Sequence, residues 1–281
     1  PEGSGPIDIS VEGEEEVVEE RPQDDFNGNL AEDMDERTLQ SMASDLIAEY
    51  KKDKNSRKEW EEAYIKGLEL LGTKYQEVTK PFKGASGVTH PLLAESVTQF
   101  QAQAYKELIP SDGPVRTKVV GLRTPQVEQQ SDRVKDYMNY MLMEKMEEYT
   151  TDMDQMLFYL PLSGSTFKKV YYDAMLGRPC SKFIPAEDLI VPYYASDLKD
   201  CERITHVIKM TENEVTKKMA AGFYRDIELA SPRETTDQVQ QKVNELQGVK
   251  RTESDMLHTI LEMHVDLNLE EYEYFDDKAK K

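Results

Sequence analysis

Cysteine is scarce in this chain of 281 residues, which contains only Cys180 and Cys201. Two cysteines are too few for a disulfide-stapled secreted scaffold or a cysteine-rich zinc module, so a reducing compartment is the default expectation. Long apolar runs are also missing, because no uninterrupted stretch approaches the roughly 20 residues that a membrane-spanning helix needs. The sequence therefore predicts neither a disulfide framework nor a membrane span.

Basic residues are the next shortage. Lys and Arg number 35 against 55 Asp and Glu, which gives a formal net charge of −20. Affinity for phosphate comes from clustered Lys and Arg, so this balance argues against autonomous, sequence-specific DNA binding. The acidic excess is concentrated in residues 1–36, which contain 14 acidic side chains and a single basic one, Arg21. With little apolar surface and strong self-repulsion, residues 1–36 are predicted to form a disordered acidic tail.

Residues 37–161 carry a helical pattern. Apolar side chains recur at three-and-four spacing over residues 39–50 and, after a polar stretch at 51–58 that predicts a break, again over residues 60–71. Pro91 is typical of the first turn of a third helix, which the apolar stripe extends to residue 108.

A short strand is predicted over residues 115–120, followed by a long helix that starts at Pro125, breaks at 150–151 and ends near residue 160. This helix is rich in methionine between Met138 and Met156. Such density suits an adaptable binding groove, but packing in a core is the favoured interpretation.

Residues 162–281 change from helical to alternating periodicity. Strands are predicted over residues 167–173 and 203–210, and a half-buried strand over 256–269, with helices started by capping boxes at Thr211–Glu214 and Ser231–Glu234. Helices come first and antiparallel strands later, without βαβ alternation, so the predicted fold class is α+β, with long amphipathic helices followed by strands and short helices.

Three motifs invite a chemical interpretation, and each fails. The loop Gly84–Gly87 lacks the Lys and hydroxyl that a phosphate-binding P-loop requires after its last glycine. The Ser163–Ser165 turn lies between helix and strand, the reverse of a nucleophile elbow. His258 and His264 share a strand face but stand about 20 Å apart, so a solvated face is favoured over a metal site. The sequence predicts no catalytic, metal or cofactor-binding residue.

An ordered set of short motifs spans residues 37–270: Trp60, Pro81-Phe82, His90-Pro91, Pro110, the turn at Gly164, Phe167-Lys168 and Pro185-x-Glu187-Asp188. In this combination the chain resembles the portal proteins, or head-to-tail connectors, of tailed bacteriophages, and most of all the large portals of podovirus-type phages. The resemblance implies a non-enzymatic virion protein that forms a dodecameric ring at one capsid vertex and is assembled in the host cytoplasm. It also implies roles in capsid assembly, DNA packaging and DNA ejection.

The same resemblance implies which partners the protein has and which part of a portal protein these residues represent. The expected partners are further copies of the chain, the major capsid protein, a scaffolding protein, the terminase motor and a tail adaptor, with double-stranded DNA passing through without sequence-specific contact and no membrane. Residues 37–281 correspond to the peripheral wing, and we expect the chain to stop before the stem and clip.

Under this resemblance a set of residues are candidates for wing packing or subunit contact: Trp60, Phe82, Lys83, Gly84, His90, Pro91, Phe100, Pro110, Gly164, Phe167, Lys168 and Pro185. Whether they pack internally or against a neighbouring subunit stays open at the level of sequence. Two other functions also stay open: an acidic, non-catalytic adaptor or scaffold, and, less favoured, a metal-dependent phosphoester hydrolase.

Overall fold

The computed structural model describes residues 34–71, 82–84, 90–232, 237–247 and 256–268, together with residues 29, 31 and 272. The predicted acidic tail lies almost wholly outside the described residues, as do Pro81 and Glu234. The chain divides into two compact units, Leu46–Asn268 and a second formed by Pro1–Asp45 with Leu269–Lys281. In the second unit the Tyr272 hydroxyl donates to the Asp45 carboxylate at 3.4 Å. Everything below concerns Leu46–Asn268, apart from the first residues of helix α1.

The first two helices are α1 (Glu36–Ser56) and α2 (Lys58–Leu70). The Asp35 carboxylate accepts a hydrogen bond from the Thr38 amide at 3.0 Å, as an N-capping side chain does. The predicted break within residues 51–58 is present but much shorter than expected, because α1 continues to Ser56 and only Arg57 separates the two helices. Two polar side chains of this stretch, Asp53 and Arg57, are buried against partners elsewhere in the fold, which local sequence does not reveal.

Helix α3 (Leu92–Leu108) begins one residue after Pro91, which takes the N-cap position instead of the first turn. Helix α4 (Pro125–Tyr140) starts at its proline as predicted, with the Thr124 hydroxyl accepting from the Val127 amide. It passes into a π-helical turn, η2 (Met141–Lys145), and α5 (Glu148–Ser163) follows. The predicted break is therefore present, but at residues 146–147 instead of 150–151.

One expectation for this region is wrong, and another holds only in part. Residues 115–120 form no strand, because the Val115 amide donates to the side chain of Asn139 in α4 and not to a neighbouring strand. The methionines divide: Met146 is buried, whereas Met138 in α4 is 46% exposed. Helix α4 has no buried residue at all, so its apolar face is not part of the core of this chain.

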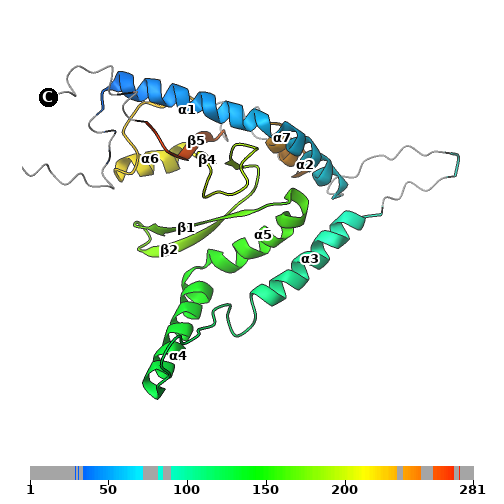
Figure 1. Cartoon of the computed structure of the whole chain (residues 1–281). Coiled ribbons are helices and arrows are strands. Elements are labelled where there is room, and N and C mark those ends of the chain that lie inside the picture. Colours follow the sequence, from blue (N-terminus) through cyan, green and yellow to red (C-terminus); the bar gives the residue numbers. More distant parts are fainter. Residues whose placement is uncertain are drawn as a thin grey trace, which may run out of the picture. The chain divides into compact units, whose positions relative to one another are not determined.

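The first sheet is a hairpin of β1 (Phe167–Asp173) and β2 (Arg178–Ile184), paired antiparallel with Phe167 opposite Ile184. β1 has the predicted bounds, whereas β2 carries a proline and polar residues and was not predicted. α5 packs along β2, as Figure 1 shows, and supplies hydrogen-bond acceptors to it: Asp152 accepts from the Phe183 amide and Glu148 from the Arg178 guanidinium. Tertiary contact with α5, not alternation, determines β2.

The second sheet has the order β3 (Leu189–Ile190), β4 (Arg203–Met210), β5 (His258–Val265), and all its pairs are antiparallel. β4 has the predicted bounds and β5 lies within its predicted range. The prediction of a solvated β5 face is wrong at Glu262, which is half-buried and forms an ion pair with Lys169 of β1. His264 on the same face is exposed. The predicted α+β class is confirmed.

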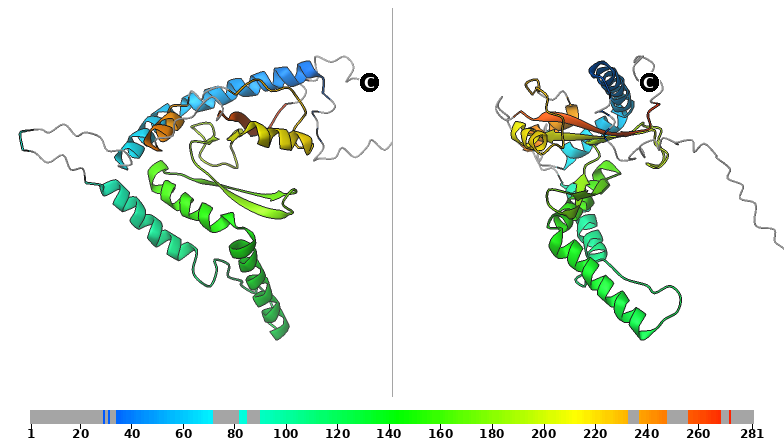
Figure 2. Two further views of the ribbon diagram at one scale, coloured as in Figure 1. Left: turned by 180° about the vertical axis from the view of Figure 1, so that it is seen from behind. Right: turned by 90° about the vertical axis from the view of Figure 1, so that its left-hand side faces the viewer.

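Helix α6 (Glu212–Ala220) has the predicted capping box, because Thr211 and Glu214 exchange side chain-to-amide hydrogen bonds. Helix α7 (Gln238–Gln247) begins later than the Ser231 pattern predicts, and the Asp237 carboxylate accepts from the Val239 amide at its start. α7 packs on α2, which Figure 2 shows from behind, and the core cluster of Tyr64, Leu68 and Val239 forms between them.

Among the described residues, no helix combines the length and the apolar character needed to cross a membrane.

Candidate functional site

The motif residues fall into two groups in the structure. The first group lies at joints within the chain: Trp60, Pro110, Gly164, Phe167, Lys168 and Pro185 are half-buried or close a turn. The second group is exposed on the surface: Phe82, Lys83, Gly84, His90, Pro91 and Phe100. Sequence left internal packing and subunit contact open for all twelve, and the geometry assigns internal packing to the first group.

Trp60 joins α2 to the end of α5. Its indole N–H donates to the Ser163 carbonyl at 3.0 Å, and its ring stacks on Tyr64 with 5.3 Å between centroids. Gly164 directly follows with φ +79°, a left-handed conformation that glycine adopts without strain. The turn predicted at Gly164 is therefore held by the predicted tryptophan, and it directs the chain from α5 into β1.

Lys168 and Pro185 also serve the joint between helices and sheets. The Lys168 ammonium lies 4.1 Å from the centre of the Tyr149 ring of α5, and its burial lowers its pKa. The Pro185 carbonyl accepts from the Asp188 amide and closes the turn between β2 and β3. Three carbonyls of this turn, those of residues 186, 187 and 189, accept hydrogen bonds from a buried arginine.

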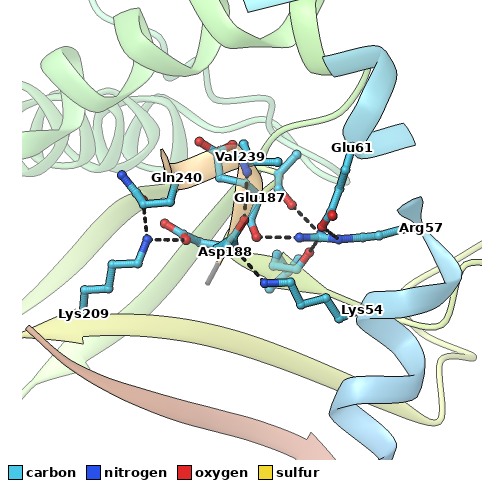
Figure 3. A network of polar contacts seen from close by, with 11 residues as sticks. Lys54, Arg57, Glu61, Glu187, Asp188, Lys209, Val239 and Gln240 are labelled. Carbon is cyan, nitrogen blue, oxygen red and sulfur yellow. Dashed lines mark hydrogen bonds and ion pairs between the residues drawn. The ribbon is translucent and has the colours of Figure 1, made fainter. Parts of the chain in front are cut away.

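That arginine, Arg57, is the centre of the polar network in Figure 3 and is only 6% exposed. Its guanidinium donates to the carbonyls of Ala186, Glu187 and Leu189 at 2.7–2.9 Å and to the Glu61 carboxylate at 3.0 Å. It also lies over the Trp60 ring, 5.1 Å from its centroid. We call this arrangement the Arg57 clamp, because one side chain fixes the α1–α2 junction to the β2–β3 turn.

The carboxylates around the Arg57 clamp are buried, but their pKa values shift in different directions. Burial raises the pKa of Glu187 and of Asp188, although Lys209 lies 3.6 Å from the Asp188 carboxylate. Burial also acts to raise the pKa of Asp237, but the hydrogen bond from Lys54 at 2.7 Å, the Lys54 charge and backbone amide hydrogen bonds together outweigh it and lower that pKa. Lys209 additionally donates to Gln240 of α7. Asp188 and Asp237 are therefore partnered within the fold, whereas Glu187 Oε2 is buried without a hydrogen-bond partner among the described residues.

A second buried arginine strengthens α1. The Arg203 guanidinium at the start of β4 pairs with Asp53, which is almost fully buried, and with Glu49 at 3.0 Å. Sequence reasoning missed Asp53, Arg57 and Arg203, because all three sit in polar stretches that are typical of solvated surface. A charged residue in such a stretch reveals its burial only through partners about 130–150 positions away.

The exposed surface carries a second feature, which we call the α4 face: Val127, Val134, Tyr137 and Met138, with Val120 and Leu122 just before the helix. All are at least 36% exposed, and Tyr137 reaches 63%. Packing of an amphipathic face usually supplies most of a helix's stability in a protein, yet no residue of α4 is buried.

The described part of the chain contains no group of three or more His, Cys, Asp or Glu side chains arranged to hold a metal ion. No family model matches this chain, and no curated protein matches it.

Proposed function

We propose that this chain is a structural subunit of a portal ring at a capsid vertex of a tailed phage, where it forms part of the peripheral wing. The ordered motifs from Trp60 to Asp188 carry the family resemblance. The observation that carries the proposal in the structure is the α4 face, because monomeric proteins seldom leave large contiguous apolar patches exposed. A neighbouring subunit in a ring would cover it.

The internal joints support a mechanical role. Trp60, Gly164 and the Arg57 clamp hold helices and strands in fixed relation, and their charged groups are engaged with one another. A ring that bears the load of packaged DNA requires such rigidity. In this role the chain makes and breaks no covalent bond, and its expected partners are the capsid, scaffolding, motor and tail proteins.

The net negative charge of the chain supports a role as a conduit for DNA. Phosphate contacts resist sliding, whereas a net charge of −20 on each chain repeated around a ring repels the DNA backbone. In the proposed function DNA passes the protein without being held. Tight binding of duplex DNA to the purified chain at physiological salt would contradict this part of the proposal.

Electron microscopy of the full-length gene product tests the assembly. Closed rings with a central hole are expected, and particles that remain monomers or dimers at every concentration would favour an acidic adaptor instead. Met138→Glu puts a charge on the α4 face and should reduce ring formation. Gln129→Glu puts the same charge on the opposite, polar side of α4 and serves as the matched control. Equal assembly of both variants would remove the α4 face from the proposal.

A further inference from the structure

Residues 115–120 precede α4 and leave most of their backbone unpaired. The sequence predicts a strand here, and side-chain exposure does alternate with a period of two, yet the segment belongs to neither sheet. The Val115 amide and carbonyl bond to the side chain of Asn139 in α4. No backbone group of residues 116–120 pairs with another backbone group in the part of the chain that the structure describes. A strand-like run with free amides and carbonyls is a template for a further strand.

This segment lies beside the α4 face. Its half-buried side chains are those of Val115, Thr117 and Val119, whereas Arg116, Lys118 and Val120 are exposed. The Thr117 hydroxyl donates to the Ser131 carbonyl of α4 at 3.2 Å. On the helix surface Ser131 is one turn from Val127 and from Val134, which belong to the α4 face. A strand added next to the segment therefore has an apolar surface beside it.

The exposed side of the segment is basic. Arg116, Lys118 and, beyond Gly121, Arg123 are exposed and form no ion pair among the described residues. The α4 carboxylates of Asp132 and Asp136 lie near Lys135 instead, at 3.7–3.8 Å. The free cations suit a negatively charged partner, and the valines between them suit an apolar one. Duplex DNA would match only the charge, so an acidic peptide strand fits the segment better.

The acidic tail of the chain contains a stretch with this chemistry. Residues 7–12, which lie outside the described part of the chain, read Ile-Asp-Ile-Ser-Val-Glu. In a strand, Ile7, Ile9 and Val11 fall on one face, and Asp8, Ser10 and Glu12 fall on the other. The pattern is therefore apolar on one side and acidic on the other, the complement of residues 115–120.

We propose that residues 115–120 bind residues 7–12 of a second copy of the chain as an added β-strand. The apolar side chains of the tail then meet Val119 and the α4 face, while its carboxylates meet Arg116 and Lys118. Neighbouring side chains on the same face of paired strands interact, and opposite charges are favourable there. A tail that is disordered when free folds as it binds. The inference rests on the proposed function, in which copies of the chain lie next to one another.

Fluorescence anisotropy tests the binding with a labelled peptide of residues 5–16 and the whole chain, at concentrations where the chain is monomeric. The peptide is expected to bind saturably at physiological salt. A second peptide has the same composition, but its apolar residues are clustered, so it keeps the charge and loses the alternation. It should bind about tenfold more weakly or worse.

N-methylated peptides test whether the contact is a strand pair. A strand added at an edge pairs through every second residue, because successive amides point to opposite sides. Methylation of the amides at residues 7, 9 and 11 and methylation at residues 8, 10 and 12 should therefore differ. One set should abolish binding and the other should be tolerated, whereas equal effects of the two sets would contradict strand pairing.

Variants locate the binding on the segment. Lys118→Glu replaces an attraction by a repulsion and should weaken peptide binding about fivefold or more. Arg133→Glu makes the same change of charge on α4, two residues from Ser131 and so on another side of the helix, and should leave binding nearly unchanged. Both side chains are exposed, so neither variant disturbs the core. Equal weakening by the two variants would indicate unspecific charge attraction.

Cross-linking identifies the source of the strand. A mixture of isotope-labelled and unlabelled whole chains, treated with a zero-length carbodiimide reagent, should join Lys118 of one copy to Asp8 or Glu12 of another. Lys106, which is exposed in α3, should be joined to these carboxylates far less often. Cross-links confined to single copies would overturn the assignment to a second copy.

The inference and the proposed function can fail separately, because peptide binding is measured on the unassembled chain. No peptide binding, or binding no tighter than that of the clustered peptide, would overturn the inference even where electron microscopy shows closed rings. Displacement of the peptide by duplex DNA would identify a phosphate-binding segment instead. Specific peptide binding by a chain that never forms rings would overturn the proposed function and leave the strand contact in place.

Discussion

Replacement of Arg57 by methionine removes the donor of the clamp while keeping a side chain of similar length. Three backbone carbonyls, those of residues 186, 187 and 189, lose their hydrogen-bond donor. The buried Glu61 carboxylate also loses its ion-pair partner. The side chains of Arg57 and Glu61 are 7% and 12% exposed, so solvent screens the loss only weakly.

Each buried polar group left unsatisfied costs about 1–3 kcal/mol, and removal of one partner from a buried ion pair costs about 3–5 kcal/mol. These penalties overlap, so we expect Arg57→Met to lower the free energy of unfolding by about 3–5 kcal/mol. Domains have total stabilities of about 5–15 kcal/mol, which makes the change large. With a urea m-value of about 2–3 kcal/mol/M, the unfolding midpoint should fall by about 1–2 M.

Urea denaturation followed by circular dichroism measures this shift. Arg57→Lys keeps the charge but not the planar fork, so it should recover only part of the loss. Lys58→Met changes the next residue, which is exposed, and should change the free energy of unfolding by no more than about 0.5 kcal/mol. A loss below about 1 kcal/mol for Arg57→Met would refute the clamp as a stabilising joint.

Three further predictions concern other contacts. Val239→Ala opens a void in the core between α2 and α7 and should cost about 2 kcal/mol in denaturant unfolding. Gly113→Ala should lower the melting temperature more than Gly121→Ala, since both have positive φ but only at Gly113 would a Cβ lie 2.4 Å from Asn139; equal losses would contradict the clash. Hydrogen bonds from the guanidinium at the start of β2 lower the pKa of Glu148 from 4.5 to about 2, so the stability they contribute is present above pH 4.5 and is lost as the pH falls toward 2. Glu148→Gln should flatten the stability profile between those pH values, and an unchanged acid profile would contradict the assigned partner.

The segments that sequence predicted well are those whose pattern is local. β1 and β4 have the predicted bounds because their side chains alternate, and α6 starts where Thr211 and Glu214 form a capping box. The α+β class follows from the order of these patterns along the chain. At the candidate site, Trp60, Gly164 and the Pro185 turn were identified as motif residues, but their partners were not.

The errors share one cause, which is that the deciding partner lies far along the chain. Residues 115–120 satisfy strand periodicity, yet Asn139 takes the Val115 amide. The polar stretch 51–58 has the composition of a loop, yet Asp53 is buried against Arg203. β2 lacks an alternating pattern, and consecutive residues of it are buried; α5 packs on it, and Asp152 of α5 accepts from the Phe183 amide.

The amino-acid sequence by itself determined the α+β class, the helices and strands with a clear local pattern, the acidic balance of the chain and the turn at Gly164, because periodicity, capping and glycine conformation act over a few residues. Only the tertiary structure decided which charges are buried and which motif residues face inward. Burial of a charge depends on a partner that offsets its loss of water, and in this protein those partners come from segments that are distant in the chain.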